Sequence, residues 1–197
     1  MSPITELIGG AKAYGWGKLL TSGSFDSIAT VTVGSGGATT VDFTSIPSNY
    51  THLQIRITAR SSTAGTLDGI AWQFNSDTGS NYSNSYQYAN GDPTTYTVYG
   101  ANETKGGQVR IAGDTATSGI FGLGIIDILD YSNTNKFKTA KAFSGDDRNG
   151  SGDVWVSANI WSSTNAITSI SFFSANGGGR KMMQYSSFAL YGIKAVA

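Results

Sequence analysis

Few residues in this chain have a type and spacing that could perform acid–base chemistry. The only histidine, His52, begins an alternating segment and falls on its polar side, where a surface residue is expected. Asp127 and Asp130 could form the carboxylate pair of a glycosidase. Residues three positions apart on a strand, however, point to opposite faces of the sheet. Neither a nucleophile elbow that opens a helix nor a phosphate-binding P-loop motif accompanies them. We therefore predict no catalytic residues and a protein that is not an enzyme.

The segment 146–153 is the candidate for metal binding. Its oxygen-bearing side chains recur at every second position, as in a calcium-binding loop: Asp147, Asn149, Ser151 and Asp153. The segment lacks the glutamate that completes an EF-hand loop, and Arg148 reduces its negative charge. Asn, Asp and Gly are also the residues that a plain hairpin turn requires. We therefore favour a turn without a metal ion, and we expect no cofactor.

Aromatic side chains are the remaining candidates for a binding site. Two tryptophans fall on the polar side of an alternating segment, and three tyrosines lie in or beside a weakly alternating polar region. They are Trp155, Trp161, Tyr82, Tyr86 and Tyr88. Aromatic rings among amide and hydroxyl groups suit sugar binding or a subunit interface, because they supply contact area at small entropic cost. The alternative is burial beneath a second sheet or a neighbouring subunit, which we favour for the two tryptophans.

The composition is nearly uncharged. Charged residues make up 13% of the 197 residues, and 13 basic side chains balance 13 acidic ones. Such a chain has no electrostatic footprint for nucleic acid or for an anionic membrane surface. Little charge repulsion keeps its copies apart. We therefore expect a protein that works within an assembly, without nucleic-acid or membrane partners. The absence of cysteine excludes disulfides and thiolate metal sites.

From residue 25 onward the hydrophobic pattern has the period of β-strands. In the segment 52–60, Leu53, Ile55 and Ile57 alternate with polar residues, as in a strand with one buried face. Many such short segments are separated by turns rich in Gly, Asn and Pro, and no helical period lies between them. This pattern predicts an all-β fold, an antiparallel two-sheet sandwich that forms one domain over residues 25–197.

Three stretches carry more specific predictions. Alternation at 154–161 places the valines and Ile160 in the core and the tryptophans outside. The run 119–131 is apolar on both sides and predicts a strand covered on both faces. The polar region 83–108 predicts a long excursion or a short hairpin. The predicted core comprises Leu53, Ile55, Ile57, Trp72, Phe74, Ile125, Val156, Ile160, Ile170, Phe188 and Leu190.

Residues 1–24 differ from the rest of the chain. Large apolar residues alternate there with glycines, so the segment has anchors but cannot bury them against itself. We expect an extended N-terminal arm that docks on a partner by filling grooves or adding a strand to a sheet edge. The predicted docking residues are Ile4, Leu7, Ile8, Tyr14, Trp16, Leu19 and Leu20.

Four blocks of sequence carry a family resemblance. They are Ile-Pro-Ser-Asn-Tyr-Thr-His-Leu-Gln-Ile-Arg at 46–56, Phe-Asn-Ser-Asp-Thr-Gly-Ser-Asn-Tyr-Ser at 74–83, Ile-Trp-Ser-Ser-Thr-Asn-Ala-Ile-Thr-Ser-Ile at 160–170, and Ser-Ser-Phe-Ala-Leu-Tyr-Gly-Ile at 186–193. In this order they resemble a jelly-roll-like module of virion structural proteins in tailed bacteriophages, including tail-fibre and other particle-surface components. The resemblance covers roughly residues 38–194 and does not extend to the arm.

The resemblance implies a sandwich of jelly-roll type and a structural role in a virion assembled in the host cytoplasm. The expected function is that of an accessory particle-surface component, either a capsid decoration protein or a tail-attached protein, which docks through its arm. The expected partners are other virion proteins and further copies of the chain, with a trimer favoured. The alternative is a tail-fibre module that binds a host-surface glycan. A scaffold of this kind does not by itself define an activity.

Overall fold

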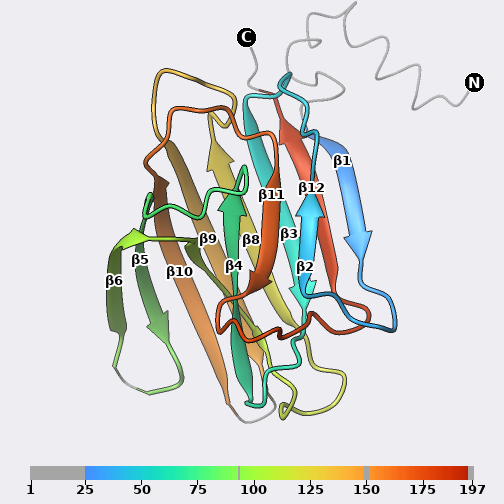
Figure 1. Cartoon of the computed structure of the whole chain (residues 1–197). Coiled ribbons are helices and arrows are strands. Elements are labelled where there is room, and N and C mark those ends of the chain that lie inside the picture. Colours follow the sequence, from blue (N-terminus) through green and yellow to red (C-terminus); the bar gives the residue numbers. More distant parts are fainter. Residues whose placement is uncertain (1–24, 93, 149–150, 195–197) are drawn as a thin grey trace, which may run out of the picture.

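The computed structural model describes residues 25–92, 94–148 and 151–194 (Figure 1). The predicted docking arm, residues 1–24, lies outside the described residues, as does Asn149 of the candidate calcium loop. The described part of the chain is built from β-strands and contains no helix, as the period of two predicts.

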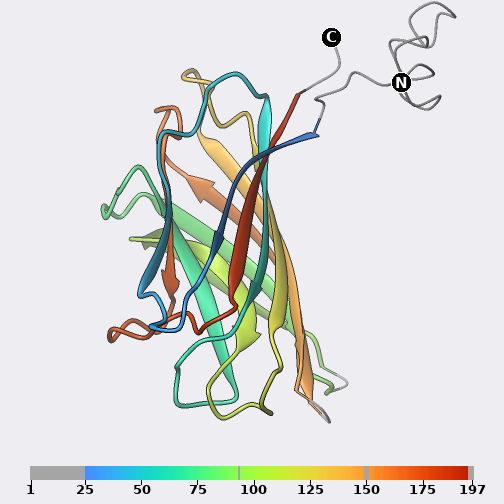
Figure 2. The ribbon, with the colours of Figure 1, turned by 90° about the vertical axis from the view of Figure 1, so that its right-hand side faces the viewer.

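The strands form two antiparallel sheets that pack face to face as a sandwich (Figure 2). The large sheet has the order β1 (Phe25–Thr32), β12 (Ser187–Ile193), β3 (His52–Ala59), β8 (Gly122–Leu129), β9 (Lys138–Asp147), β10 (Gly152–Trp161), β5 (Tyr82–Ala89) and β6 (Tyr96–Glu103). The small sheet has the order β2 (Thr40–Phe43), β11 (Ile170–Ser174), β4 (Leu67–Phe74) and β7 (Gly106–Ala112).

Eight of these strands form a jelly roll, as expected. Strands β1, β12, β3 and β8 form one four-stranded layer, and β2, β11, β4 and β7 form the other. This chain order and pairing is that of a double-sheet jelly roll, and we call these eight strands the jelly-roll body. Two hairpins are inserted into it: β5–β6 lies between β4 and β7 in the sequence, and β9–β10 lies between β8 and β11. The region 83–108 thus contains most of a hairpin, one of the two predicted alternatives.

The two inserted hairpins join each other and extend the large sheet. Strand β9 pairs with β8 of the body, and β10 pairs with β5. The inserted strands therefore continue past β7, the edge strand of the small sheet, which contacts β9, β10 and β5. This extension creates an inner surface that the body alone would not have.

The core of the body is apolar and aromatic. Phe172 of β11 packs its ring against Phe188 of β12, with ring centroids 5.5 Å apart, and edge-on against Phe43, at 6.2 Å. Of the predicted core residues, those confirmed as buried are Leu53, Ile55, Ile57, Trp72, Phe74, Ile170, Phe188 and Leu190. Their burial accounts for most of the driving force for folding of this layer pair.

Three predicted core residues are not in the core. Val156 and Ile160 are exposed on the outer face of β10, and Ile125 is only partly buried on β8. Strand β10 faces the opposite way from the prediction, with Trp155 and Trp161 on its inner side. This orientation is favoured because an indole ring buries more apolar area than a valine side chain. The strand 122–129 is likewise not covered on both faces, since its outer side is exposed.

Candidate functional site

The inner face of the inserted hairpins lies against the edge of β7 and is polar. The Asn159 side-chain oxygen accepts a hydrogen bond from the Gly107 backbone N–H at 2.8 Å, and Ser144 accepts one from the Arg110 N–H at 2.9 Å. Buried edge N–H groups need such partners. The approach is close enough to require glycine, because a Cβ at Gly107 would lie 2.1 Å from Asn159 Oδ1. Side chains thus protect the edge strand that no neighbouring strand covers.

A stacked column of aromatic rings fills the same surface beyond β7. The Arg110 guanidinium lies 4.2 Å from the centre of the Trp155 ring, in cation–π geometry. Trp155 stacks on Tyr88 at 4.5 Å, and Tyr88 stacks on Tyr96 at 4.9 Å. The Tyr86 ring leans against Trp155 at 5.6 Å. The column holds the two inserted hairpins together and fixes the position of Tyr86.

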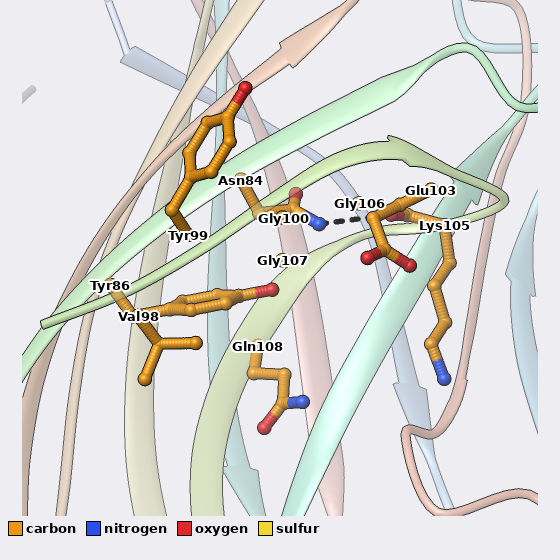
Figure 3. A pocket seen from close by; sticks show the side chains of 10 residues that line it. All are labelled: Asn84, Tyr86, Val98, Tyr99, Gly100, Glu103, Lys105, Gly106, Gly107 and Gln108. Atoms are coloured by element: carbon orange, nitrogen blue, oxygen red, sulfur yellow. Dashed lines mark hydrogen bonds between the residues drawn. The ribbon is translucent and has the colours of Figure 1, made fainter.

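A pocket of about 160 Å³ lies beside this column, between β5, β6 and the start of β7 (Figure 3). Asn84 of β5 is part of the wall of this pocket and is 4% exposed. The Asn84 side-chain nitrogen is 3.4 Å from the Lys105 carbonyl oxygen, whereas its side-chain oxygen has no hydrogen-bond partner among the described residues. A buried acceptor without a donor is costly and calls for an explanation.

Other polar groups surround the same space. Figure 3 shows the Tyr86 ring lying across the pocket, with Gln108 beneath it and the Glu103 carboxylate beyond its hydroxyl group. Burial, followed by the negative charge of Glu103, raises the pKa of Tyr86 to about 12. Its hydroxyl group therefore keeps its proton at neutral pH. The Lys105 ammonium donates to the Ala175 carbonyl oxygen at 2.6 Å.

The candidate acid–base residues serve structural contacts instead. His52 Nδ1 accepts a hydrogen bond from the Asp130 backbone N–H at 3.0 Å, and the Asp130 carboxylate pairs with Lys136. The Lys136 hydrogen bond is the main cause of the lowered pKa of Asp130. Asp127 accepts a hydrogen bond from the Gln54 side chain at 2.8 Å. His52 and Asp127 line one hollow. The Asp127 carboxylate, however, already accepts from Gln54, and the Asp130 carboxylate already pairs with Lys136.

The candidate calcium loop contains a cluster of ion pairs. The Asp153 carboxylate is 2.9 Å from Arg148 Nη2 and 3.4 Å from Arg110 Nε. Arg148 Nε lies 3.0 Å from Asp146 Oδ2, without hydrogen-bond geometry. Burial raises the pKa of Asp146 despite the opposing charge of Arg148. The Asp153 carboxylate thus pairs with two arginines. In the described ranges, no group of three or more His, Cys, Asp or Glu residues could hold a metal ion.

The five aromatic candidates fall into two groups. Tyr82, Trp155 and Trp161 are buried inside the chain and offer no platform on the surface, which agrees with the alternative favoured for the tryptophans. Trp161 donates its indole N–H to Asp77 at 2.7 Å. Tyr86 and Tyr88 are half-buried on the inner face of the inserted hairpin. Of the five, Tyr86 is the one that lines the pocket.

The outer face of the large sheet has an exposed apolar surface that the sequence did not indicate. Val156 lies opposite Phe143, and Phe143 lies opposite Ile125, in one row across β10, β9 and β8. The exposed members of this outer apolar face are Leu123, Leu129, Phe143, Val154, Val156 and Ile160, which are 42% to 56% exposed. One polar row crosses it, in which Lys141 of β9 lies opposite Asp127 of β8.

Comparisons with protein-family models, with curated proteins and with solved structures found no match for this chain. The described residues include no helix long and apolar enough to cross a membrane. The functional argument therefore depends on the residues and surfaces of this chain.

Proposed function

We propose that the chain is a non-enzymatic structural protein of tailed-bacteriophage particles, an accessory component of the particle surface that assembles with further copies of itself. The four blocks that resemble virion proteins all lie along one scaffold. They lead into β3, connect β4 to β5, connect β10 to β11, and form β12. Three of the four blocks shape or flank strands of the jelly-roll body, and the last is a body strand itself.

The observation that carries this proposal is the outer apolar face. Soluble proteins that work alone rarely keep a contiguous apolar surface of this kind exposed, and such surfaces mark interfaces. We assign the neighbouring molecule as a second copy of the chain. The net charge of the chain is zero, so copies do not repel each other. The polar row offers Lys141 and Asp127 side by side, which can pair with the same residues of a neighbour. A trimer with these faces around a common axis is the expected form.

The oligomeric state in solution tests this assignment. Light scattering coupled to size-exclusion chromatography of the full chain should give a mass three times that of one chain. Phe143→Glu places a charge in the centre of the face and should give the monomer mass without loss of β-structure by circular dichroism. Tyr185→Glu is the matched control, because Tyr185 is 70% exposed and lies in the loop before β12, outside the strands that form this face. A wild-type monomer would contradict self-assembly through this surface.

The place on the particle needs a separate test. Mass spectrometry of gradient-purified particles should detect the chain and give its copy number relative to the major capsid protein. A high ratio indicates decoration of the capsid, and a low ratio indicates a tail appendage. Deletion of residues 1–24 should remove the chain from particles if the arm makes the attachment. Absence of the wild-type chain from purified particles would contradict the virion role.

The second candidate function is that of a receptor-binding module for a host-surface glycan. The pocket between β5, β6 and β7 favours it, because a tyrosine ring and several polar side chains line it together. A glycan-binding role and a structural role are compatible in one particle-surface protein.

A further inference from the structure

We propose that β6 is an interface strand, which pairs antiparallel with β6 of a second copy of the chain and joins two large sheets edge to edge. Strand β6 lies at one end of the large sheet, where β5 is its one neighbour among the described strands (Figure 1). The inference goes beyond the proposed function and does not depend on it, because a contact at the edge of the sheet leaves the outer apolar face uncovered.

The other three sheet edges of the described chain have features that discourage pairing. The side chains of Asn159 and Ser144 accept hydrogen bonds from backbone N–H groups of β7. Strand β2 has a length of 4 residues. Strand β1 has a register irregularity between Ser27 and Ala29. Covered edges, short edge strands and bulges are means by which proteins prevent unwanted pairing.

Strand β6 instead offers a regular and uncharged segment. Its register with β5 is continuous from Tyr96 to Gly100 and shifts beyond Gly100. Residues 94–102 include no charged side chain and no proline. Val98 is 45% exposed and Tyr99 is 72% exposed, so the edge is apolar as well as unpaired. A regular, apolar edge strand of this kind is a template for a further strand.

The length of the regular segment determines the register of the proposed pair. An antiparallel pairing that uses all of Tyr96–Gly100 in both copies must be centred on Val98, which then lies opposite Val98 of the second copy. Thr97 lies opposite Tyr99, and a β-branched residue opposite an aromatic one stabilises a sheet. Tyr96 lies opposite Gly100, whose bare backbone is covered by the aromatic ring across from it.

Charge and symmetry favour a second copy as the occupant of this edge. No charged side chain lies within the pairing segment, so the two-fold arrangement places no like charges directly opposite each other. The net charge of zero also allows two copies to approach. Because each β6 edge covers the other, the contact is isologous and stops at a pair.

The contact is expected to be weak in isolation. A segment of this length buries much less than the roughly 1,200–2,000 Å² of a stable complex. Dilute chromatography should therefore still report the mass that the outer apolar face determines. A covalent trap is suited to so weak a contact, and the chain provides a clean background for it because it contains no cysteine.

Single cysteine substitutions in the full-length chain test the contact. Proteins with Val98→Cys, Thr97→Cys or Tyr99→Cys are oxidised at high concentration, and covalent dimer is measured by non-reducing electrophoresis. Directly opposite residues have Cα atoms about 4.5–5.5 Å apart, within the range of about 4.4–6.8 Å that a disulfide requires. Val98→Cys should therefore give about tenfold more dimer than either other variant, whose cysteines lie diagonally across the pair and beyond this range.

A mixture of two variants tests the register. Equimolar Thr97→Cys and Tyr99→Cys proteins should give dimer together, although neither does so alone, because the two positions lie opposite each other. Equal amounts of dimer from all three single variants would indicate a parallel contact or random collision and would overturn the proposal. Absence of dimer from Val98→Cys would overturn it as well.

The Phe143→Glu background separates this contact from assembly through the outer apolar face. Val98→Cys should still give dimer in that background, because β6 lies outside the surface that Phe143→Glu disrupts. Loss of the dimer there would assign the cross-link to assembly through the outer face and overturn the edge contact. A wild-type monomer in light scattering, together with a persistent Val98→Cys dimer, would contradict the outer-face interface and support the pairing of β6.

Discussion

The jelly-roll body and the inserted hairpins use the inner face of the same large sheet in different ways. In the body, β3 and β12 present Ile55, Ile57 and Leu190 to the small sheet, and the contact is apolar. In the inserted hairpins the inner residues are largely polar or aromatic, and their hydrogen bonds satisfy the edge of β7. One region is a sealed core, whereas the other contains a pocket.

This difference shows how a common scaffold acquires a specific surface. The body is closed by side chains whose packing needs no particular hydrogen-bond partners. The inserted hairpins depend on particular pairs, such as Asn159 with Gly107, and on stacked rings. Buried polar groups need partners, and several in the inserted hairpins have no hydrogen-bond partner among the described residues, including the Asn84 oxygen and the Trp155 indole nitrogen. We therefore expect stability to depend mainly on the body.

The largest expected effect is in the core of the body. Phe172→Ala should lower the free energy of unfolding by about 3–5 kcal/mol, because it removes a fully buried ring and leaves a cavity between the sheets. Urea denaturation of the variant and wild type measures the difference. Phe137→Ala is the matched control, since Phe137 is 55% exposed and should change little. Equal losses for the two variants would contradict a core concentrated in the body.

The next effect tests whether polar contacts stabilise the inserted hairpins without a metal ion. Asp153→Ala should lower the free energy of unfolding by about 3 kcal/mol, because it leaves the buried charges of Arg110 and Arg148 less compensated. Asp114→Ala, at an exposed aspartate, is the control. Calcium and a chelator should leave the melting temperature of the wild type unchanged. Stabilisation by calcium would reverse the preference for a turn over a metal site.

A smaller, pH-dependent effect concerns the turn that joins the body to the first inserted hairpin. Burial of Asp77 acts to raise its pKa, but hydrogen bonds from Trp161, Asn81 and the Gly79 N–H outweigh burial and lower the pKa below 3.8. A lowered folded-state pKa contributes stability above the unfolded-state pKa, and that stability is lost as the pH falls through the folded-state value.

Asp77→Asn should therefore reduce stability at neutral pH and flatten the loss of stability below about pH 4. Urea midpoints measured across this acid range for the wild type and variant provide the comparison. Asp42→Asn, at an aspartate whose hydrogen bond comes from the nearby Thr40, is the control. An acid limb as steep in Asp77→Asn as in wild type would show that this carboxylate is not responsible.

The fold was predictable because its signals are local. Alternation in β3 and turn residues between strands define a sandwich without knowledge of long-range contacts. The turn at Asp77 was predictable for the same reason, since its carboxylate accepts the Gly79 N–H at 2.8 Å, two residues along the chain. The jelly-roll type followed from the order of the four resembling blocks.

The site was less predictable because it depends on pairing between distant segments. In β10 both faces carry hydrophobic residues, so alternation could not decide whether Val156 or Trp155 faces inward. In the structure Trp155 faces inward, where Arg110 of β7 and Tyr88 of β5 contact its ring. Asn84 appears in the sequence as one more polar residue. Its burial and missing partner arise only when β5, β6 and β7 come together.

The smallest expected effect tests this reversed orientation of β10. Val156→Thr should change the free energy of unfolding by less than about 0.5 kcal/mol, because Val156 is 51% exposed on the outer face. The same substitution at Val109, which is fully buried on β7, should cost about 1–3 kcal/mol, since the added hydroxyl group has no partner there. Both variants should be made in the Phe143→Glu background, so that loss of assembly does not contribute to the measured stability. A cost at Val156 equal to that at Val109 would place the valines of β10 in the core, turn Trp155 outward, and remove the column that positions Tyr86 beside the pocket.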